Sequence, residues 1–71
     1  MRVLTPHAFG EEIRIRRRGL DLSQDRLADA IGVNRRVVGE LERGKGTVRL
    51  EIALAAARAL GLDVELRVRG E

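Results

Sequence analysis

The pattern of apolar and polar residues near the start of the chain predicts a helix over roughly residues 6–18. Thr5 supplies a hydroxyl cap, and Pro6 suits the first helical position, where a missing N–H costs nothing. Gly19 is expected to end the helix, and Leu20 and Leu22 are expected to contact the core from the connection that follows. The inward face carries two residues four positions apart, Phe9 and Ile13.

Two short helices joined by a glycine turn are predicted next. Ser23 caps the first of them, Gly32 supplies a turn conformation that a side chain would resist, and Asn34 caps the second. The first has inward positions Leu27, Ala28 and Ile31. The second has an apolar side formed by Val37, Val38 and Leu41. Its other side carries Arg35, Arg36, Gly39, Glu40 and Arg43.

An alanine-rich stretch after Gly46 predicts a fourth helix. Thr47 is expected to cap it, and it runs to about Leu60, where Gly61 ends it. Its small side chains let neighbours pack close. The gaps between them are expected to be filled by Leu50, Leu54 and Leu60.

Beyond Gly61 the apolar period shortens to that of a strand, so residues 62–71 are predicted to be a half-buried strand. The apolar residues are Leu62, Val64, Leu66 and Val68, and they alternate with charged ones. An unpaired apolar strand edge is a liability, so a second copy of the chain is expected to supply the missing ladder. The alternative partner is residues 2–4 of the same or the other chain.

The charges of this segment favour one register for self-pairing. Antiparallel pairing centred on Leu66 sets Asp63 opposite Arg69. It also sets Glu65 opposite Arg67, and cross-strand ion pairs contribute ~0.2 to 1 kcal/mol each. A register centred on Glu65 would instead place two glutamates face to face.

The predicted fold is all-α, a bundle of four helices with one C-terminal β-strand that pairs across a homodimer. Residues 1–5 form an N-terminal arm, 6–61 the helical domain and 62–71 the dimerisation strand. A chain of 71 residues buries only about 60% of its unfolded surface, so help from a partner chain is expected.

Composition narrows the chemistry. Lys and Arg number 14 against 11 Asp and Glu, and all but one of the 14 are arginine, which favours forked contacts to phosphate or guanine. The chain has one aromatic residue, Phe9, so it lacks the aromatic stacking platform that binds single strands or RNA loops. It has no cysteine, and His7 has no plausible metal partner, so no metal, no cofactor and no catalytic activity is expected. No stretch approaches the ~20 apolar residues of a membrane span, so no membrane partner is expected. The expected location is cytoplasmic and associated with the nucleoid.

Residues 23–44 have the layout of a helix-turn-helix, in which two short helices flank a glycine turn and adjacent arginines open the second. Over about residues 9–61 the chain resembles the phage-repressor (XRE/Cro) helix-turn-helix family. The matching residues are Ser23-Gln24, Leu27-Ala28, Ile31-Gly32-Val33, Val38 and Leu41-Glu42-Arg43-Gly44. The flanks Leu4-Thr5-Pro6 and Ala59 to Leu66 resemble the HipB-like antitoxin branch.

The resemblance implies roles for individual residues. Bases would be contacted by Arg35, Arg36 and Glu40. DNA phosphates would be contacted by Ser23, Gln24, Asn34, Gly39, Arg43 and Lys45. Arg17 and Glu42 match a family pair that joins the first helix to the third, so Arg17 is expected to be structural.

Three of these assignments stay open. Arg35 and Arg36 either donate to guanine or contact phosphate alone. Glu40 either accepts from cytosine or pairs with Arg36 one turn earlier, which is the preferred interpretation. Gly39 stands where many relatives carry serine; it either permits close approach to DNA or weakens the contacts.

The implied function is sequence-specific repression at an inverted-repeat operator in double-stranded DNA. The HipB-like resemblance adds autoregulation of a toxin operon and binding of a HipA-like kinase toxin. The alternatives are a standalone XRE-type regulator without a toxin, and a protein-interaction module for which DNA binding is incidental.

Overall fold

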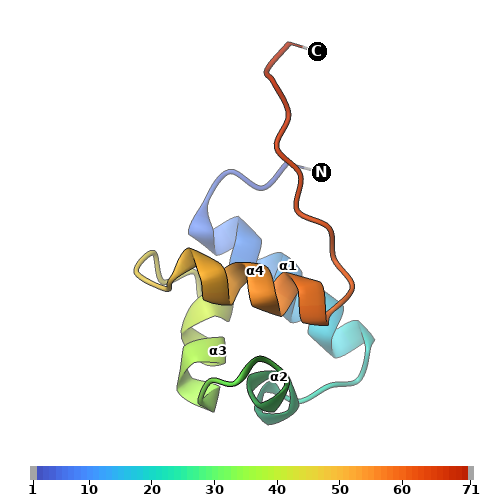
Figure 1. The fold of residues 1–71 in the computed structure, drawn as a ribbon, viewed down its shortest axis with the longest axis vertical. Helices are drawn as coiled ribbons and strands as arrows, with labels where there is room; N and C mark the ends of the chain where they lie inside the picture. Colours follow the sequence, from blue (N-terminus) through green and yellow to red (C-terminus); the bar gives the residue numbers. More distant parts are fainter. Residues whose placement is uncertain (1, 71) are drawn as a thin grey trace.

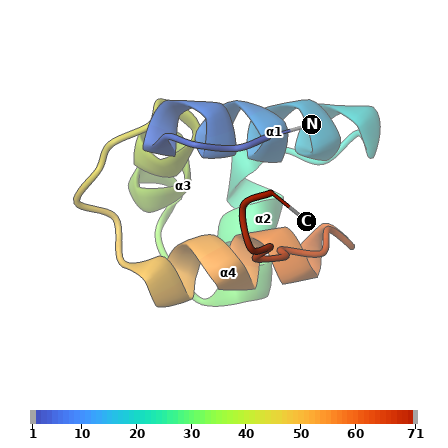
Figure 2. The same cartoon turned by 90° about the horizontal axis from the view of Figure 1, so that it is seen from above.

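The computed structural model describes residues 2–70, so Met1 of the predicted arm and Glu71 of the predicted strand lie outside the described residues. The helices in this part of the chain are α1 (Pro6–Gly19), α2 (Gln24–Ile31), α3 (Arg35–Glu42) and α4 (Leu50–Ala59). α1 packs on α3, α3 on α2, and α2 on α4. Figure 2 shows α1 and α4 on opposite sides of the molecule, bridged by α2 and α3. The predicted four-helix architecture is confirmed.

Side-chain caps fix the starts of the first three helices, as predicted. The N–H of Ala8 donates to Thr5 Oγ1 at 3.0 Å, with Pro6 in the first turn. The equivalent bonds run from Arg26 to Ser23 Oγ at 3.1 Å and from Val37 to Asn34 Oδ1 at 3.2 Å. Each cap satisfies one backbone donor that the helix itself leaves unpaired.

α1 ends one residue beyond the predicted range of 6–18, and the connection after it differs from the prediction. Gly19 is the last helical residue, but the left-handed position falls two residues later at Asp21, whose φ is 60°. Leu20 therefore points outward and is exposed, whereas Leu22 packs against the core as expected. The predicted stop at Gly19 is confirmed to within one residue, and the helix closes on backbone bonds from Leu20 to the carbonyls of Arg16 and Arg17.

The start of α4 also differs. The helix begins after Arg49 without a side-chain cap, not after Thr47. The reason is the turn before it, in which the N–H of Val48 donates to the Lys45 carbonyl at 3.3 Å and Val48 packs against the core. Leu50 consequently faces outward and is 71% exposed, so its predicted place in the core was wrong.

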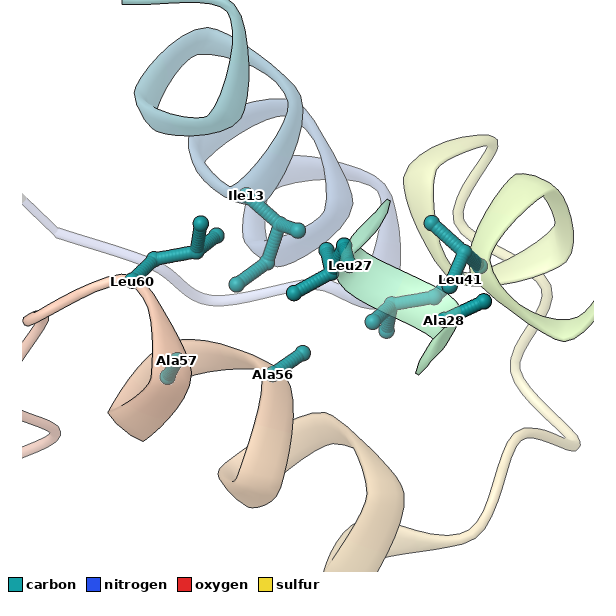
Figure 3. Close-up of a cluster of buried hydrophobic side chains, with 8 residues drawn as sticks. Ile13, Leu27, Ala28, Leu41, Ala56, Ala57 and Leu60 are labelled. Carbon is teal, nitrogen blue, oxygen red and sulfur yellow. The ribbon is translucent and has the colours of Figure 1, made fainter. Parts of the chain in front are cut away.

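One contiguous apolar core holds the helices together. Its fully buried members come from every helix and from the residue after α4, and Figure 3 shows their side chains converging. They are Ile13, Leu27, Ala28, Val38, Leu41, Ala56, Ala57 and Leu60. The predicted inward residues Phe9, Ile31 and Leu22 pack around this core and are partly buried.

Gly10 lets α1 and α3 approach closely. A Cβ built on Gly10 would collide with the backbone carbonyl of Leu41 and lie 2.9 Å from that of Glu42. No side chain fits there without separating the two helices. This contact sets the distance at which α1 presents its arginines beside α3.

The C-terminal segment leaves the helices as an extended chain, as Figure 1 shows. Leu62 packs against the core and its N–H donates to the Ala57 carbonyl at 2.9 Å. Beyond it Leu66 is 98% exposed and Val68 is 70% exposed. The predicted strand is absent from residues 62–70 of this single chain, and no backbone bonds join them to residues 2–4. A strand needs a hydrogen-bonding partner, and one chain alone supplies none here.

Candidate nucleic-acid interface

The turn between α2 and α3 holds the two helices in a fixed relation. Gly32 takes the left-handed conformation with φ 75°, as predicted, and its N–H donates to the Asp29 carbonyl at 3.4 Å. Val33 donates to the Ala28 carbonyl at 3.0 Å and packs against the core. The chain then restarts at the Asn34 cap. Because Val33 anchors the turn, α3 is presented as part of the rigid core.

α3 has one buried side and one exposed side. Val38 is 0% exposed, and Leu41 is buried beside it. Arg35 and Arg36 stand exposed in the first turn of the helix, and Arg43 is exposed just past its end. Gly39 is buried, which corrects its predicted place on the outer side of the helix. The Arg43 guanidinium lies beside it, and a Cβ at Gly39 would be 3.1 Å from an Arg43 terminal nitrogen.

A buried ion pair joins α1 to α3, confirming the predicted structural role of Arg17. Arg17 Nε lies 2.6 Å from Glu42 Oε2, and a terminal nitrogen lies 3.0 Å from Oε1. The other terminal nitrogen donates to the Leu22 carbonyl at 2.6 Å. Both partners are almost fully enclosed, and bidentate geometry satisfies the carboxylate.

Gln24 connects this ion pair to the exposed arginines. Its Nε2 donates to Glu42 Oε1 at 3.1 Å, and its Oε1 accepts from Arg35 Nε at 3.4 Å. Glu42 accepts only, so the amide must turn its oxygen toward Arg35. The Arg35 side chain is therefore held through its Nε, and its two terminal amino groups take no part in this contact.

Glu40 pairs with Lys45, which corrects the preferred expectation of a pair with Arg36. Lys45 Nζ lies 3.0 Å from Glu40 Oε2, and the Lys45 N–H donates to the Glu40 carbonyl at 3.0 Å. The chain can return this way because Gly44 adopts φ 82°. The hydrogen bond from Lys45 lowers the pKa of Glu40 below its ordinary value; the charges of Arg36 and Arg43 act in the same direction, and partial desolvation opposes them.

Two arginines that the sequence analysis left without a role line a hollow beside these groups. Arg14 and Arg18 of α1 face it together with Gln24 and Arg35. Their four-residue spacing on one helix face was the available signal. Arg16, by contrast, serves the fold, because its Nε donates to the Leu60 carbonyl at 2.9 Å.

The comparisons with known proteins agree with this geometry. A family model described as helix-turn-helix matches residues 13–66. The chain belongs to the helix-turn-helix family. It is 36% identical over 70 residues to y4mF of Sinorhizobium fredii, an uncharacterized HTH-type transcriptional regulator, covering 99% of this chain and 92% of that one. It is 43% identical over 51 residues to an uncharacterized HTH-type transcriptional regulator of Methanothermobacter thermautotrophicus, covering 72% and 74%.

Solved structures share the fold. The chain superposes on one in the HipB-O4 20mer complex with a TM-score of 0.87 at 17% identity, covering 97% of each chain. It superposes on one in the HipA-HipB-O2-O3 complex with a TM-score of 0.88 at 17% identity, again covering 97% of each. The predicted resemblance to the XRE family is thus confirmed, and the protein is a DNA-binding transcriptional regulator of that helix-turn-helix type.

Within this family assignment, α2 and α3 are the helix-turn-helix pair. The caps at their starts occupy the side-chain oxygens of Ser23 and Asn34. In residues 2–70, no helix is both long enough and apolar enough to cross a lipid bilayer.

Proposed function

We propose that the protein is a sequence-specific repressor that binds double-stranded DNA through the exposed start of α3. The observation that carries this proposal is the placement of Arg35 and Arg36 on the outer face of a helix whose other face is locked into the core. In helix-turn-helix proteins the second helix lies in the major groove with its N-terminal residues at the base edges. Because the ligand would be chromosomal DNA, the protein would act on the nucleoid in the cytoplasm.

Arg35 is the better supported of the two base contacts. Its Nε is engaged by Gln24 at 3.4 Å, which leaves both terminal amino groups to donate to O6 and N7 of one guanine. A bidentate pair of this kind discriminates by ~1 to 3 kcal/mol against the wrong base. Glu40 is committed to Lys45, so a cytosine contact would first have to break that ion pair. We therefore assign base selection to the two arginines and place Glu40 outside it.

The phosphate contacts would flank the arginines. Ser23, Gln24 and Asn34 stand at the starts of α2 and α3, where unpaired backbone N–H groups favour anions. Arg43 and Lys45 lie beyond the end of α3 and would bind the backbone on the other side of the groove. Lys45 can do so while paired with Glu40, because its ammonium group has three N–H donors. Gly39 lies beside the Arg43 guanidinium, so it would assist phosphate binding indirectly, by leaving room for the Arg43 side chain.

A homodimer would present two copies of α3 to successive major grooves, roughly 34 Å apart, on an inverted repeat. The C-terminal segment supports this proposal. Val64, Leu66 and Val68 are exposed, and Glu65 lies 3.3 Å from Arg67, two residues along an extended chain, so their charges share one side. Antiparallel pairing about Leu66 would exchange this contact for cross-strand ion pairs and bury the apolar edge.

A HipA-like kinase toxin is the proposed protein partner. The support is the close match of fold to the chain in the HipA-HipB-O2-O3 complex. The experiment is copurification of the protein with the product of the adjacent open reading frame. Recovery of a stable complex supports a role as an antitoxin. If the adjacent frame encodes a kinase-like protein and no complex is recovered, the protein is a standalone regulator.

The DNA proposal is tested with the double variant Arg35→Ala/Arg36→Ala, with Arg58→Ala on α4 as the matched control. The preference for a selected operator over random duplex should fall by about 30-fold or more in the double variant, since two contacts of ~1 to 3 kcal/mol each are lost, and stay unchanged in the control. An unchanged preference in the double variant contradicts the proposal. Light scattering of a variant ending at Gly61 tests the dimer, and a stable dimer without residues 62–71 would refute strand pairing.

A further inference from the structure

A hollow lies between α1, which is not part of the helix-turn-helix pair, and the starts of α2 and α3. Its lining comes from three helices and the α1–α2 connection: Arg14, Arg17, Arg18, Ser23, Gln24, Asp25, Arg35 and Glu42. Four of these side chains are guanidinium groups and two are carboxylates, so the hollow carries a positive excess.

Most of the polar side chains that α2 and α3 contribute to the hollow already have partners within the protein, as does Arg17 of α1. Arg17 and Glu42 neutralise each other at 2.6 Å. Ser23 caps α2, and the Gln24 amide bonds to Glu42 and Arg35. Beyond the phosphate contacts proposed above at the start of α2, the side chains left for an incoming ligand are therefore mainly the cations of α1.

Arg18 and Arg14 differ in their present engagement. Arg18 is exposed and has no ion pair or side-chain hydrogen bond within residues 2–70. Arg14 is held by Glu11 through a bidentate contact at 2.7 and 3.3 Å, with both side chains 38% exposed. A pair this accessible to water is worth little, so a second anion can displace Glu11 at small cost.

We propose that this hollow receives one phosphate of the DNA backbone, bound by Arg18 and by Arg14 after its release from Glu11. The DNA footprint then extends beyond α2 and α3 onto α1. This inference rests on the proposed function and adds two contacts that neither the helix-turn-helix pattern nor the family assignment supplies.

The geometry favours a backbone phosphate because α1 cannot move independently. Gly10 brings α1 against the backbone of α3, and the Arg17–Glu42 pair locks the two helices together. Arg14 and Arg18 lie one helical turn apart on the same face, beside the start of α2. Arg35 lines the same hollow, so a DNA strand whose bases contact Arg35 would bring its phosphates close to Arg14 and Arg18.

The test is the salt dependence of DNA binding by the full chain. The slope of log affinity against log salt has a magnitude of about 0.9 for each phosphate neutralised. For Arg14→Gln/Arg18→Gln we expect it to fall by about 0.9 per bound protomer, on operator and random duplex alike. Glu11→Gln frees Arg14 and should tighten binding to both duplexes. Arg58→Gln is the matched control and should leave the slope unchanged.

Two further arms separate the explanations. Arg14→Lys/Arg18→Lys retains both positive charges and should keep most of the salt slope. If the arginines were needed only for folding, the lysine variant would lose the slope as well. Replacing chloride by inorganic phosphate at equal ionic strength should weaken binding of the native chain more than that of Arg14→Gln/Arg18→Gln.

The inference is overturned if Arg14→Gln/Arg18→Gln keeps the native slope, or if it changes base preference. It is also overturned if inorganic phosphate saturates the hollow while the slope is unaffected by the substitutions, since the site then takes a free anion. In each case Arg35→Ala/Arg36→Ala can still abolish operator preference, so the proposed function stands. A native chain that binds no duplex refutes the proposed function instead.

Discussion

Removing the Glu42 carboxylate should be among the most damaging single substitutions in the chain. Glu42 accepts two bonds from Arg17, at 2.6 and 3.0 Å, and one from Gln24 at 3.1 Å. The Arg17 side chain is 11% exposed and that of Glu42 is 3% exposed. Glu42→Ala would leave a guanidinium enclosed in the protein with its main counter-charge gone and one remaining carbonyl partner, Leu22.

The expected cost follows from this burial. Breaking a buried ion pair by removing one partner typically costs about 3 to 5 kcal/mol, because the remaining charge is uncompensated. A domain of this size has a total stability of about 4 to 11 kcal/mol. Glu42→Ala should therefore remove about a quarter or more of the free energy of unfolding. The loss of Gln24's partner adds to the effect and should release Arg35.

Urea denaturation followed by circular dichroism measures this change. The matched control is Glu51→Ala, which removes a glutamate from an exposed pair with Arg49 at 3.5 Å and should change stability by less than about 0.5 kcal/mol. The double replacement Arg17→Met/Glu42→Leu should recover much of the loss, since no buried charge then remains. A loss below about 1 kcal/mol for Glu42→Ala would refute the assignment of this pair as a buried lock.

Three other substitutions test the remaining elements. Gly10→Ala would drive a methyl group into the Leu41 carbonyl, and it should lower the free energy of unfolding in urea by about 1 to 3 kcal/mol or more; no change would contradict the close approach. Asn34→Ala removes the cap of α3 and should cost about 0.5 to 2 kcal/mol in the same assay. Because the folded pKa of Glu40 is lowered by Lys45, its contribution to stability is present above the unfolded pKa and declines as pH falls through the folded one. NMR titration should show that Lys45→Ala raises the Glu40 pKa toward its ordinary value, and an unshifted pKa would contradict the pair.

The parts of the fold that local chemistry determines could be predicted from the sequence. Thr5, Ser23 and Asn34 cap helices because each side-chain oxygen serves a backbone donor only three residues away. Gly32 adopts the left-handed turn for an equally local reason. The helical period alone predicted that Val38 and Leu41 are buried on α3. It did not predict the burial of Gly39 and Glu42, which depends on Arg43 and Arg17.

The misplaced features depend on contacts between distant residues or between chains. α4 begins after Arg49 because Val48 packs against the core, and no local signal at Thr47 reveals that packing. Lys45 takes Glu40 from Arg36 because the loop turns back over α3. The predicted strand has the right alternation, but a ladder requires partner bonds that a single chain does not make.

The arginines proposed to contact bases could be picked from the sequence pattern, whereas the phosphate contacts proposed on α1 could not. The arginines that open α3 follow from the helix-turn-helix layout. Arg14 and Arg18 belong to a different helix, and they line the same hollow as Arg35 because Gly10 brings α1 against α3. Proximity of this kind is a property of the packed structure.

Selection of duplexes from a fully random DNA library by the purified native chain tests the central claim most directly. If the exposed arginines of α3 choose bases, the bound fraction should be enriched in an inverted repeat that contains guanine in each half-site, with half-site centres one helical turn apart. Uniform recovery of all sequences at physiological ionic strength would contradict the account.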